Sequence, residues 1–336
     1  MSARTTGSSP ALAQLGRLLL QPGLMVVTFL VLAVVITAAV EPRFLNPLNI
    51  NNLLRNFAFL AIPAMAQMLV MKSGGFDLSV GAVVAGASVI SAMTMSAMLQ
   101  AFPGMEGAAI LVALCVAVGA GLVVGLVNGA LVAYQDLSPF MVTLAMASVV
   151  LGLALYYTQG IPVYGIADSF INNIGRGRWF GYPPVLFIAL GIVALLVVMQ
   201  RFTRLGRHIY AVGSDMRAAR LSGVSARYTL LKAYAMAGGL SALTGFLMTS
   251  RIGSGQANIA STLALETIAA CVIGGVSLRG GVGRAEHVAL AALFLVVVAN
   301  AMNLTGIDSR FQTLVLGVVL IIALSIEHLL LRRRLA

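Results

Sequence analysis

Four polar residues lie inside or beside long apolar stretches of this sequence, where they could contact a polar solute that crosses a membrane. They are Asp77, Asn128, Glu266 and Asn300. A carboxylate at the centre of a spanning helix costs about 2.5–3.5 kcal/mol. Glu266 is therefore expected to face the bundle or a water-filled cavity, unless it lies at the outer rim. The two asparagines have a second interpretation, because a buried amide can also tie neighbouring helices together. The four residues are candidates for a translocation pathway.

Asp77 follows a pair of glycines in the stretch Gly74-Gly-Phe-Asp-Leu-Ser-Val-Gly81. Two adjacent glycines permit a sharp turn, and Asp77 then stands where it can cap a helix that begins at Leu78. One interpretation is a broken helix whose positive N-terminal end faces a polar route. The other is an ordinary cap at the membrane face, and the residues alone leave both open.

A second glycine-rich stretch lies 200 residues further along and reads Gly274-Gly-Val-Ser-Leu-Arg-Gly-Gly281. Aligned with the first stretch, it repeats Gly-Gly, then Leu, then Gly. This repetition predicts two weakly related halves, an arrangement that transporters often have. The motif glycines of the two stretches are Gly74, Gly75, Gly81, Gly274, Gly275, Gly280 and Gly281.

The basic segment of about residues 201–228 contains a short helix candidate from Asp215 to Leu221. Asp215 can cap its N-terminus, and Gly223 can end it in a turn. The small side chains of Ala218 and Ala219 would let another surface approach closely, so the groove of a soluble partner could receive this helix. The alternative is a positively charged loop that only sets the topology.

The composition places all these residues in a membrane protein. The chain has 336 residues, of which 60% are hydrophobic and 9% are charged, and its mean hydropathy is +1.00. A soluble domain carries about 25% charged residues, and a spanning helix needs about 20 mostly apolar ones. We therefore expect an all-α polytopic membrane protein with about ten transmembrane helices. The expected spans are Leu24–Val40, Leu53–Met71, Leu78–Leu99, Ala108–Tyr134, Phe140–Tyr157, Val185–Gln200, Tyr228–Met248, Thr262–Leu278, His287–Asn303 and Phe311–Leu331.

Basic residues set the expected orientation, because they are enriched in cytoplasmic loops. With both termini in the cytoplasm, fifteen of the 21 lysines and arginines lie on that side. Residues 1–22 are then a cytoplasmic segment with an amphipathic helix at Ala11–Leu20. Residues 23–331 form the transmembrane domain, and residues 332–336 form a basic cytoplasmic tail. The basic residues left outside are Arg43, Arg55, Arg176, Arg178, Arg251 and Arg310.

Several functions are excluded. The net charge of +11 does not indicate nucleic-acid binding, because the basic residues lie in the short gaps between apolar runs. Cys115 and Cys271 lie within apolar runs and His208, His287 and His328 are scattered, so we expect neither a disulfide framework nor a metal site. The sequence also has no Gly-Lys-Ser/Thr loop, Gly-x-Ser-x-Gly or His-Glu-x-x-His. It is therefore no ATPase or recognisable hydrolase.

Three segments give the sequence a resemblance to a known family. They are Gly74–Gly81, Gly206-Arg-His-Ile-Tyr-Ala-Val-Gly213 with Ala218-Ala-Arg-Leu-Ser-Gly223, and Gly274–Gly281. In these segments the chain resembles the permease subunits of bacterial ATP-binding-cassette importers of the ribose type, which also serve xylose, arabinose, galactose and autoinducer-2. The likeness runs from about Phe44 to Leu324, nearly the whole chain.

The resemblance implies a permease subunit that forms the pathway for a small sugar across the bacterial inner membrane. A second permease subunit (a copy or a paralogue), a cytoplasmic ATPase and a periplasmic sugar-binding protein would be its partners. ATP and magnesium would be bound by the ATPase, and this chain would hold no cofactor and catalyse no reaction. The implied ATPase-coupling loop includes Gly206, Arg207, Gly213, Ala218, Ala219 and Gly223.

The sequence departs from the family pattern at three places. Phe76 stands where the first motif usually has isoleucine, Val276 replaces a threonine or other small residue, and Ala264-Leu-Glu-Thr-Ile-Ala269 replaces the commoner Glu-Leu-Asp-Ala-Ile-Ala. These changes leave the identity of the sugar open. The alternative function is a secondary transporter or facilitator for a small polar solute, which would need no ATPase partner. A passive membrane scaffold or a membrane enzyme has less support, since no catalytic constellation is present.

Overall fold

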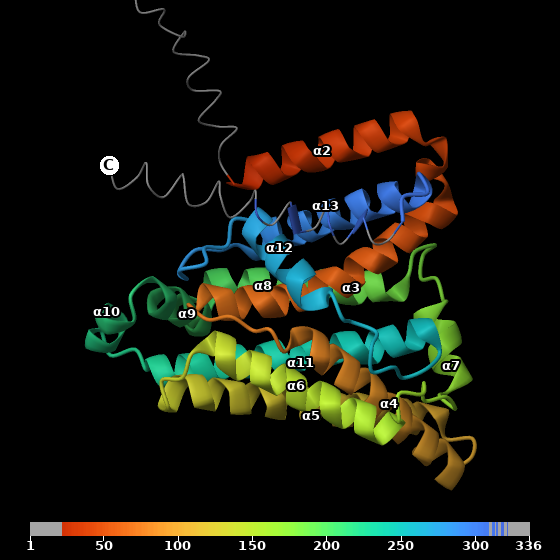
Figure 1. Cartoon of the computed structure of the whole chain (residues 1–336), viewed down its shortest axis with the longest axis horizontal. Helices are drawn as coiled ribbons and strands as arrows, with labels where there is room; N and C mark the ends of the chain where they lie inside the picture. The colour runs from red at the N-terminus through yellow and green to blue at the C-terminus, as the bar shows by residue number, and fades with distance from the viewer. Residues whose placement is uncertain (1–21, 309–310, 313, 315–316, 319–320, 322–336) are drawn as a thin grey trace, which may run out of the picture.

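The computed structural model describes residues 22–308, 311–312, 314, 317–318 and 321, and this part of the chain forms a bundle of helices (Figure 1). The α-helices are α2 (Pro22–Val40), α3 (Pro47–Lys72), α4 (Val80–Ala101), α5 (Glu106–Tyr134), α6 (Pro139–Thr158), α7 (Asp168–Phe170), α8 (Pro184–Phe202), α9 (Arg204–Ser214), α10 (Met216–Leu221), α11 (Ala226–Ile252), α12 (Leu263–Ile273) and α13 (Ala285–Leu304). A 3-10 turn, η1 (Pro42–Leu45), precedes α3, and a π-helical turn, η2 (Ile171–Gly175), follows α7.

Eight of the described helices are long and apolar enough to cross a membrane, and they are α2, α3, α4, α5, α6, α8, α11 and α13. The prediction of an all-α polytopic membrane protein is therefore confirmed. The amphipathic helix expected at Ala11–Leu20, most of the last expected span and the basic tail at residues 332–336 lie outside the described residues.

The span expected at Thr262–Leu278 is shorter than predicted. Its helix, α12, has only 11 residues, which is about 16 Å at 1.5 Å per residue and about half of a 30 Å hydrocarbon core. Gly275 ends it in a left-handed conformation with φ +76°. The apolar run continued past this turn, so composition alone overestimated the helix.

The centre of the bundle is formed by α3 and α11, whose side chains are buried along most of their length. α13 packs on one side of α3 and α2 packs on α13, whereas α4 and α5 pack against α11 (Figure 1). α5 and α11 approach so closely that a side chain at Gly125 would overlap Tyr234 O, and one at Gly238 would overlap Gly121 O. Close contacts between small residues are the usual way for membrane helices to pack.

Two features interrupt this bundle of long helices. Between α3 and α4 the chain runs through the non-helical segment 73–79, and α9 and α10 lie beyond one end of the long helices (Figure 1). These interruptions contain Asp77 and most of the residues of the implied ATPase-coupling loop.

Candidate functional site

Asp77 and Asn128, two of the four pathway candidates, are brought together through Ser79. The carboxylate Oδ1 of Asp77 accepts hydrogen bonds from the Ser79 N–H at 2.8 Å and from the Ser79 hydroxyl at 2.5 Å. The amide Nδ2 of Asn128, on α5, donates to the Ser79 hydroxyl oxygen at 3.0 Å. Asp77 is 2% exposed and Asn128 is fully buried.

Asp77 does not cap α4 in the way that the sequence suggests. The helix begins at Val80 rather than at Leu78, and it has no side-chain cap. Asp77 instead bonds the N–H two residues ahead, as aspartate does in tight turns. The side chain thereby fixes the last residues of segment 73–79 just before the helix starts.

Segment 73–79 is held by side chains from two other helices. The hydroxyl of Tyr234, on α11, donates to Phe76 O at 3.1 Å, and Leu78 N–H donates to the hydroxyl oxygen of Thr143, on α6, at 3.0 Å. A side chain at Gly75 would overlap the Tyr234 hydroxyl. Asp77 thus lies in a buried break between α3 and α4. That the start of α4 faces a polar route stays a prediction.

Two fully buried amides keep polar atoms without partners in the described part of the chain. They are Asn128 Oδ1 and both side-chain polar atoms of Gln67, which lies on α3 and is fully buried. Leaving a buried polar group unpaired costs about 1–3 kcal/mol, so these atoms are suited to bonding a solute or water. Gln67 was not singled out from the sequence, although an amide within the apolar run Leu53–Met71 was a usable signal.

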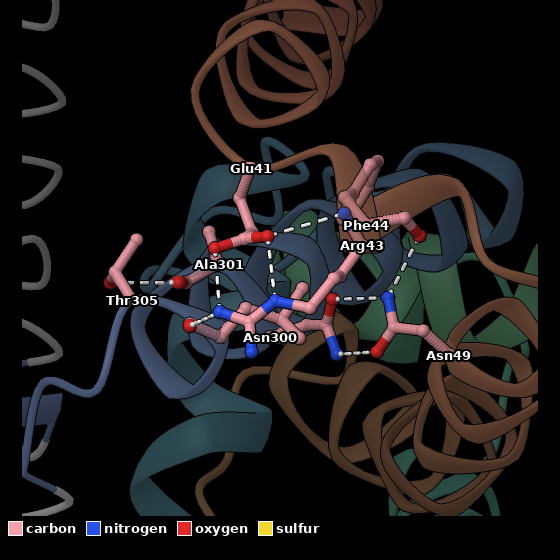
Figure 2. A network of polar contacts seen from close by, with 8 residues as sticks. Glu41, Arg43, Phe44, Asn49, Asn300, Ala301 and Thr305 are labelled. Atoms are coloured by element: carbon pink, nitrogen blue, oxygen red, sulfur yellow. Dashed lines mark hydrogen bonds and ion pairs between the residues drawn. The ribbon is translucent and has the colours of Figure 1, made fainter.

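Glu266 and Asn300 lie apart from this cluster. Glu266 is half-buried in the first turn of α12, and its Oε1 accepts a 2.7 Å hydrogen bond from the hydroxyl of Thr262. Asn300, on α13, exchanges two amide hydrogen bonds with Asn49 at 2.8 and 3.0 Å (Figure 2). Asn300 therefore ties α13 to the first turn of α3, which is the second of its two predicted interpretations.

A compact polar network surrounds the two asparagines (Figure 2). Asn49 Nδ2 also donates to Phe44 O at 2.9 Å. Nearby, Arg43 forms a 2.8 Å ion pair with Glu41 and donates to Leu304 O at 3.3 Å. The Arg43 guanidinium lowers the pKa of Glu41 to about 2. The network joins η1, the first turn of α3 and the C-terminal part of α13 at one end of the bundle.

The expected docking helix is present as α10. Asp215 Oδ1 accepts hydrogen bonds from the N–H groups of Arg217 and Ala218 at 2.8 and 2.9 Å, and Gly223, with φ +79°, ends the turn after the helix. The two alanines have different environments. Ala218 is exposed, whereas Ala219 packs inward, so only Ala218 is available to an approaching surface.

The remaining candidate residues of this loop lie on α9. A side chain at Gly206 would overlap Met199 O on α8, so Gly206 seats the start of α9 against the bundle. Arg207 is exposed. Gly213, near the C-terminal end of α9, contacts both glycine-rich stretches.

The other motif glycines allow close contact elsewhere in the bundle. A side chain at Gly81, at the start of α4, would lie 2.6 Å from Ala260 O, and one at Gly274 would lie 2.8 Å from Val288 Cα. These positions join the glycine-rich stretches to the turn before α12 and to α13.

α3 and α12 end in the same way at their glycine pairs, but the positions that match in the structure are not those that match in the sequence alignment. Gly74 and Gly275 both have positive φ. The residue after each glycine donates its N–H to the carbonyl five residues before it, Gly75 to Val70 O and Val276 to Cys271 O. The matching positions are 201 residues apart, one more than in the alignment. The same cap follows α10 and α13 at Gly223 and Gly306, and it is common in proteins generally. Two related halves therefore stay a prediction.

A cavity of about 580 Å³ lies between α2 and α13, near the end of the bundle that carries Arg284. Gly23 and His287 are among its lining residues, and the four pathway candidates are not. In the part of the chain that the structure describes, no group of three or more His, Cys, Asp and Glu residues could hold a metal ion.

Comparison with known proteins assigns the chain to a family. A family model described as branched-chain amino acid transport system / permease component matches residues 49–324. The chain belongs to this permease family. The ribose import permease protein RbsC of Bacillus subtilis (strain 168) is 36% identical over 301 residues, which cover 89% of this chain and 90% of that protein.

Two further relatives of this permease come from Escherichia coli (strain K12). The galactose/methyl galactoside import permease protein MglC is 33% identical over 317 residues, or 91% of this chain and 94% of MglC. The ribose import permease protein RbsC is 33% identical over 303 residues, or 89% of this chain and 91% of RbsC. The family resemblance expected from the three motifs is confirmed. No solved structure matches the permease.

Proposed function

We propose that this permease is the membrane subunit of an ATP-binding-cassette importer and forms the pathway for a small sugar across the bacterial inner membrane. The observation that carries the proposal is α10, a capped six-residue helix that lies beyond the ends of the long helices with Ala218 exposed. Such a helix is suited to a groove in a soluble partner. The relatives whose names specify ribose or galactose import support a sugar as the solute.

The partners follow from this proposal. A cytoplasmic ATPase binds ATP and magnesium and receives α10, so the permease itself needs no cofactor and catalyses no reaction. A second permease subunit, either a copy or a paralogue, completes the pathway, and a periplasmic binding protein delivers the sugar. The end of the bundle that carries α9 and α10 also carries Arg201, Arg204, Arg207, Arg217 and Arg220, which supports a cytoplasmic position for this end. Both termini are proposed to be cytoplasmic as well.

The pathway is proposed to pass the buried cluster of Asp77, Ser79 and Asn128. Hydroxyl groups of a sugar both donate and accept hydrogen bonds, and the unpaired Asn128 Oδ1 offers an acceptor. Gln67 offers both a donor and an acceptor. Glu266 remains a pathway candidate, whereas the amide of Asn300 is already occupied by Asn49 and is assigned a structural role.

The test is uptake of labelled ribose and galactose into proteoliposomes that hold the permease, its ATPase and its binding protein. We expect uptake of at least one sugar that requires ATP on the ATPase side and stops when ATP is omitted. Uptake by the permease alone, driven by a proton or sodium gradient, would instead establish the secondary transporter. Uptake by the permease alone without ATP or an ion gradient would establish the facilitator.

A further inference from the structure

Four glycines from three separate segments of the chain meet at one end of the bundle. Gly74 follows α3, Gly213 lies in the last turn of α9, and Gly280 and Gly281 lie between α12 and α13. We propose that this contact, the glycine junction, passes movement of α9 and α10 to both glycine-rich turns at once. These four residues would then be positioning residues for transport. The proposal rests on the importer function proposed above.

The glycine junction consists largely of main-chain contacts. A side chain at Gly213 would overlap Lys72 O and would lie 2.6 Å from Gly281 N. A side chain at Gly280 would lie 2.7 Å from Gly213 O and 2.8 Å from Gly74 Cα. The Gly281 N–H donates a 2.9 Å hydrogen bond to Lys72 O, which joins the two turns directly. Each segment is therefore in contact with the other two.

Main-chain contacts transmit displacement more directly than side-chain contacts do. A side chain can absorb a small shift by changing rotamer, whereas a packed main chain has no such freedom and passes the strain on. Gly74 and Gly280 both have φ +89°, a conformation that other residues adopt only at a cost. The shape of both turns is thus fixed, and a shift of α9 must displace them together.

On the cytoplasmic side of the junction, α9 and α10 behave as one unit. Only Asp215 separates the two helices, and it caps α10. Ala219, on α10, belongs to the same buried cluster as Val212, on α9. A force on the exposed side of α10 therefore reaches Gly213 without passing a flexible linker.

On the membrane side of the junction, the chain leads directly to the proposed pathway. Asp77 follows Gly74 by three residues and positions Ser79 through two hydrogen bonds. Ser79 in turn accepts the hydrogen bond from Asn128. A displacement of the turn at Gly74 therefore acts on the polar cluster where the sugar is proposed to bind.

The proposal is tested with Gly213→Ala and Gly281→Ala in the complete complex of permease, ATPase and binding protein. The measured quantity is the number of sugar molecules taken up per ATP hydrolysed. We expect both variants to assemble with the ATPase and hydrolyse ATP, but to lose uptake. The matched control is Gly245→Ala in α11, where the added methyl group would overlap Val84 O on α4, away from the junction. Gly245→Ala should keep the wild-type number of sugar molecules taken up per ATP hydrolysed, even if less of the folded protein is recovered.

If Gly213→Ala fails to fold, the proposal is tested with Gly281→Ala alone and with Gly281→Ala combined with Ser214→Gly. The methyl group in Gly281→Ala would overlap the Ser214 hydroxyl oxygen, so adding Ser214→Gly should restore part of the lost ratio. A wild-type ratio in Gly281→Ala would overturn the proposed role of the glycine junction, whereas a ratio that Ser214→Gly raises would support it. If the unaltered complex shows no ATP-dependent uptake, the importer function itself is wrong, which is a distinct result.

Discussion

The cap of α10 offers a sharp test of the docking helix. Asp215→Ala removes both hydrogen bonds from Asp215 Oδ1 to the N–H groups of Arg217 and Ala218. Loss of a helix cap costs about 1 kcal/mol. A helix of six residues has little stability of its own, so this loss acts directly on the population of folded α10. At 1.4 kcal/mol per tenfold change, 1 kcal/mol corresponds to about a fivefold change in the ratio of folded to unfolded α10.

The matched control is Asp215→Asn. Asparagine caps helices about as well as aspartate, but it carries no charge, so it separates the hydrogen bonds from the electrostatic effect on the helix end. We expect the amides of residues 217–221 to exchange about fivefold faster with deuterium in Asp215→Ala, and nearly at the wild-type rate in Asp215→Asn. Hydrogen exchange followed by mass spectrometry measures these exchange rates in both purified variants.

The same variants then test the role of α10 in docking. If the ATPase binds only the folded helix, its affinity should fall by the same factor as the folded fraction of α10, which is at most about fivefold in Asp215→Ala. Equal exchange rates in Asp215→Ala and in the wild type would refute the capping argument. A lower folded fraction of α10 with unchanged ATPase affinity would show that the partner docks elsewhere.

Changes at three further positions test the exposed side of α10, the tie between α13 and α3, and the polar cluster. Ala218→Arg places a bulky side chain on the exposed side of α10 and should abolish ATP-dependent uptake without preventing membrane insertion; normal uptake would contradict the docking role. Asn300→Ala leaves Asn49 Oδ1 without its donor and should lower the stability of the purified chain by about 1–3 kcal/mol. Uptake should be retained as long as the chain is folded. A melting temperature equal to that of the wild type would show that the hydrogen bonds between Asn300 and Asn49 are dispensable. Asp77→Asn can keep both hydrogen bonds from Ser79, whereas Asp77→Ala loses them. Uptake should therefore be higher in Asp77→Asn than in Asp77→Ala. An equal loss of uptake in the two variants would assign a role to the charge of Asp77 itself.

Most of the fold could be predicted because membrane spans are local in sequence. Each spanning helix satisfies its own backbone hydrogen bonds, so about 20 apolar residues identify it without knowledge of its neighbours. α12 was overestimated for the same reason. A half-length helix that is buried among other helices is as apolar as one that faces lipid, and hydropathy does not record where the chain turns.

The candidate site was only partly predictable, since its contacts join distant parts of the chain. Asp77 and Asn128 were named separately, but no local pattern shows that Ser79 connects them. Asn300 was named with two interpretations, and only the position of Asn49, 251 residues away in sequence, decides between them. Gln67 was missed although it is, like Asn128 and Asn300, a single amide within a long apolar run.

The breaks in the bundle depend on other elements in a way that continuous helices do not. Segment 73–79 has little helical hydrogen bonding of its own, and inside a membrane its backbone groups must be satisfied by protein. Phe76 O is bonded by Tyr234, Leu78 N–H by Thr143, and Lys72 O by Gly281 N–H. The geometry of the break is therefore set by α6, α11 and the turn before α13. A continuous helix such as α5 keeps its hydrogen bonds when its neighbours shift, so movement of α9 should alter the break first.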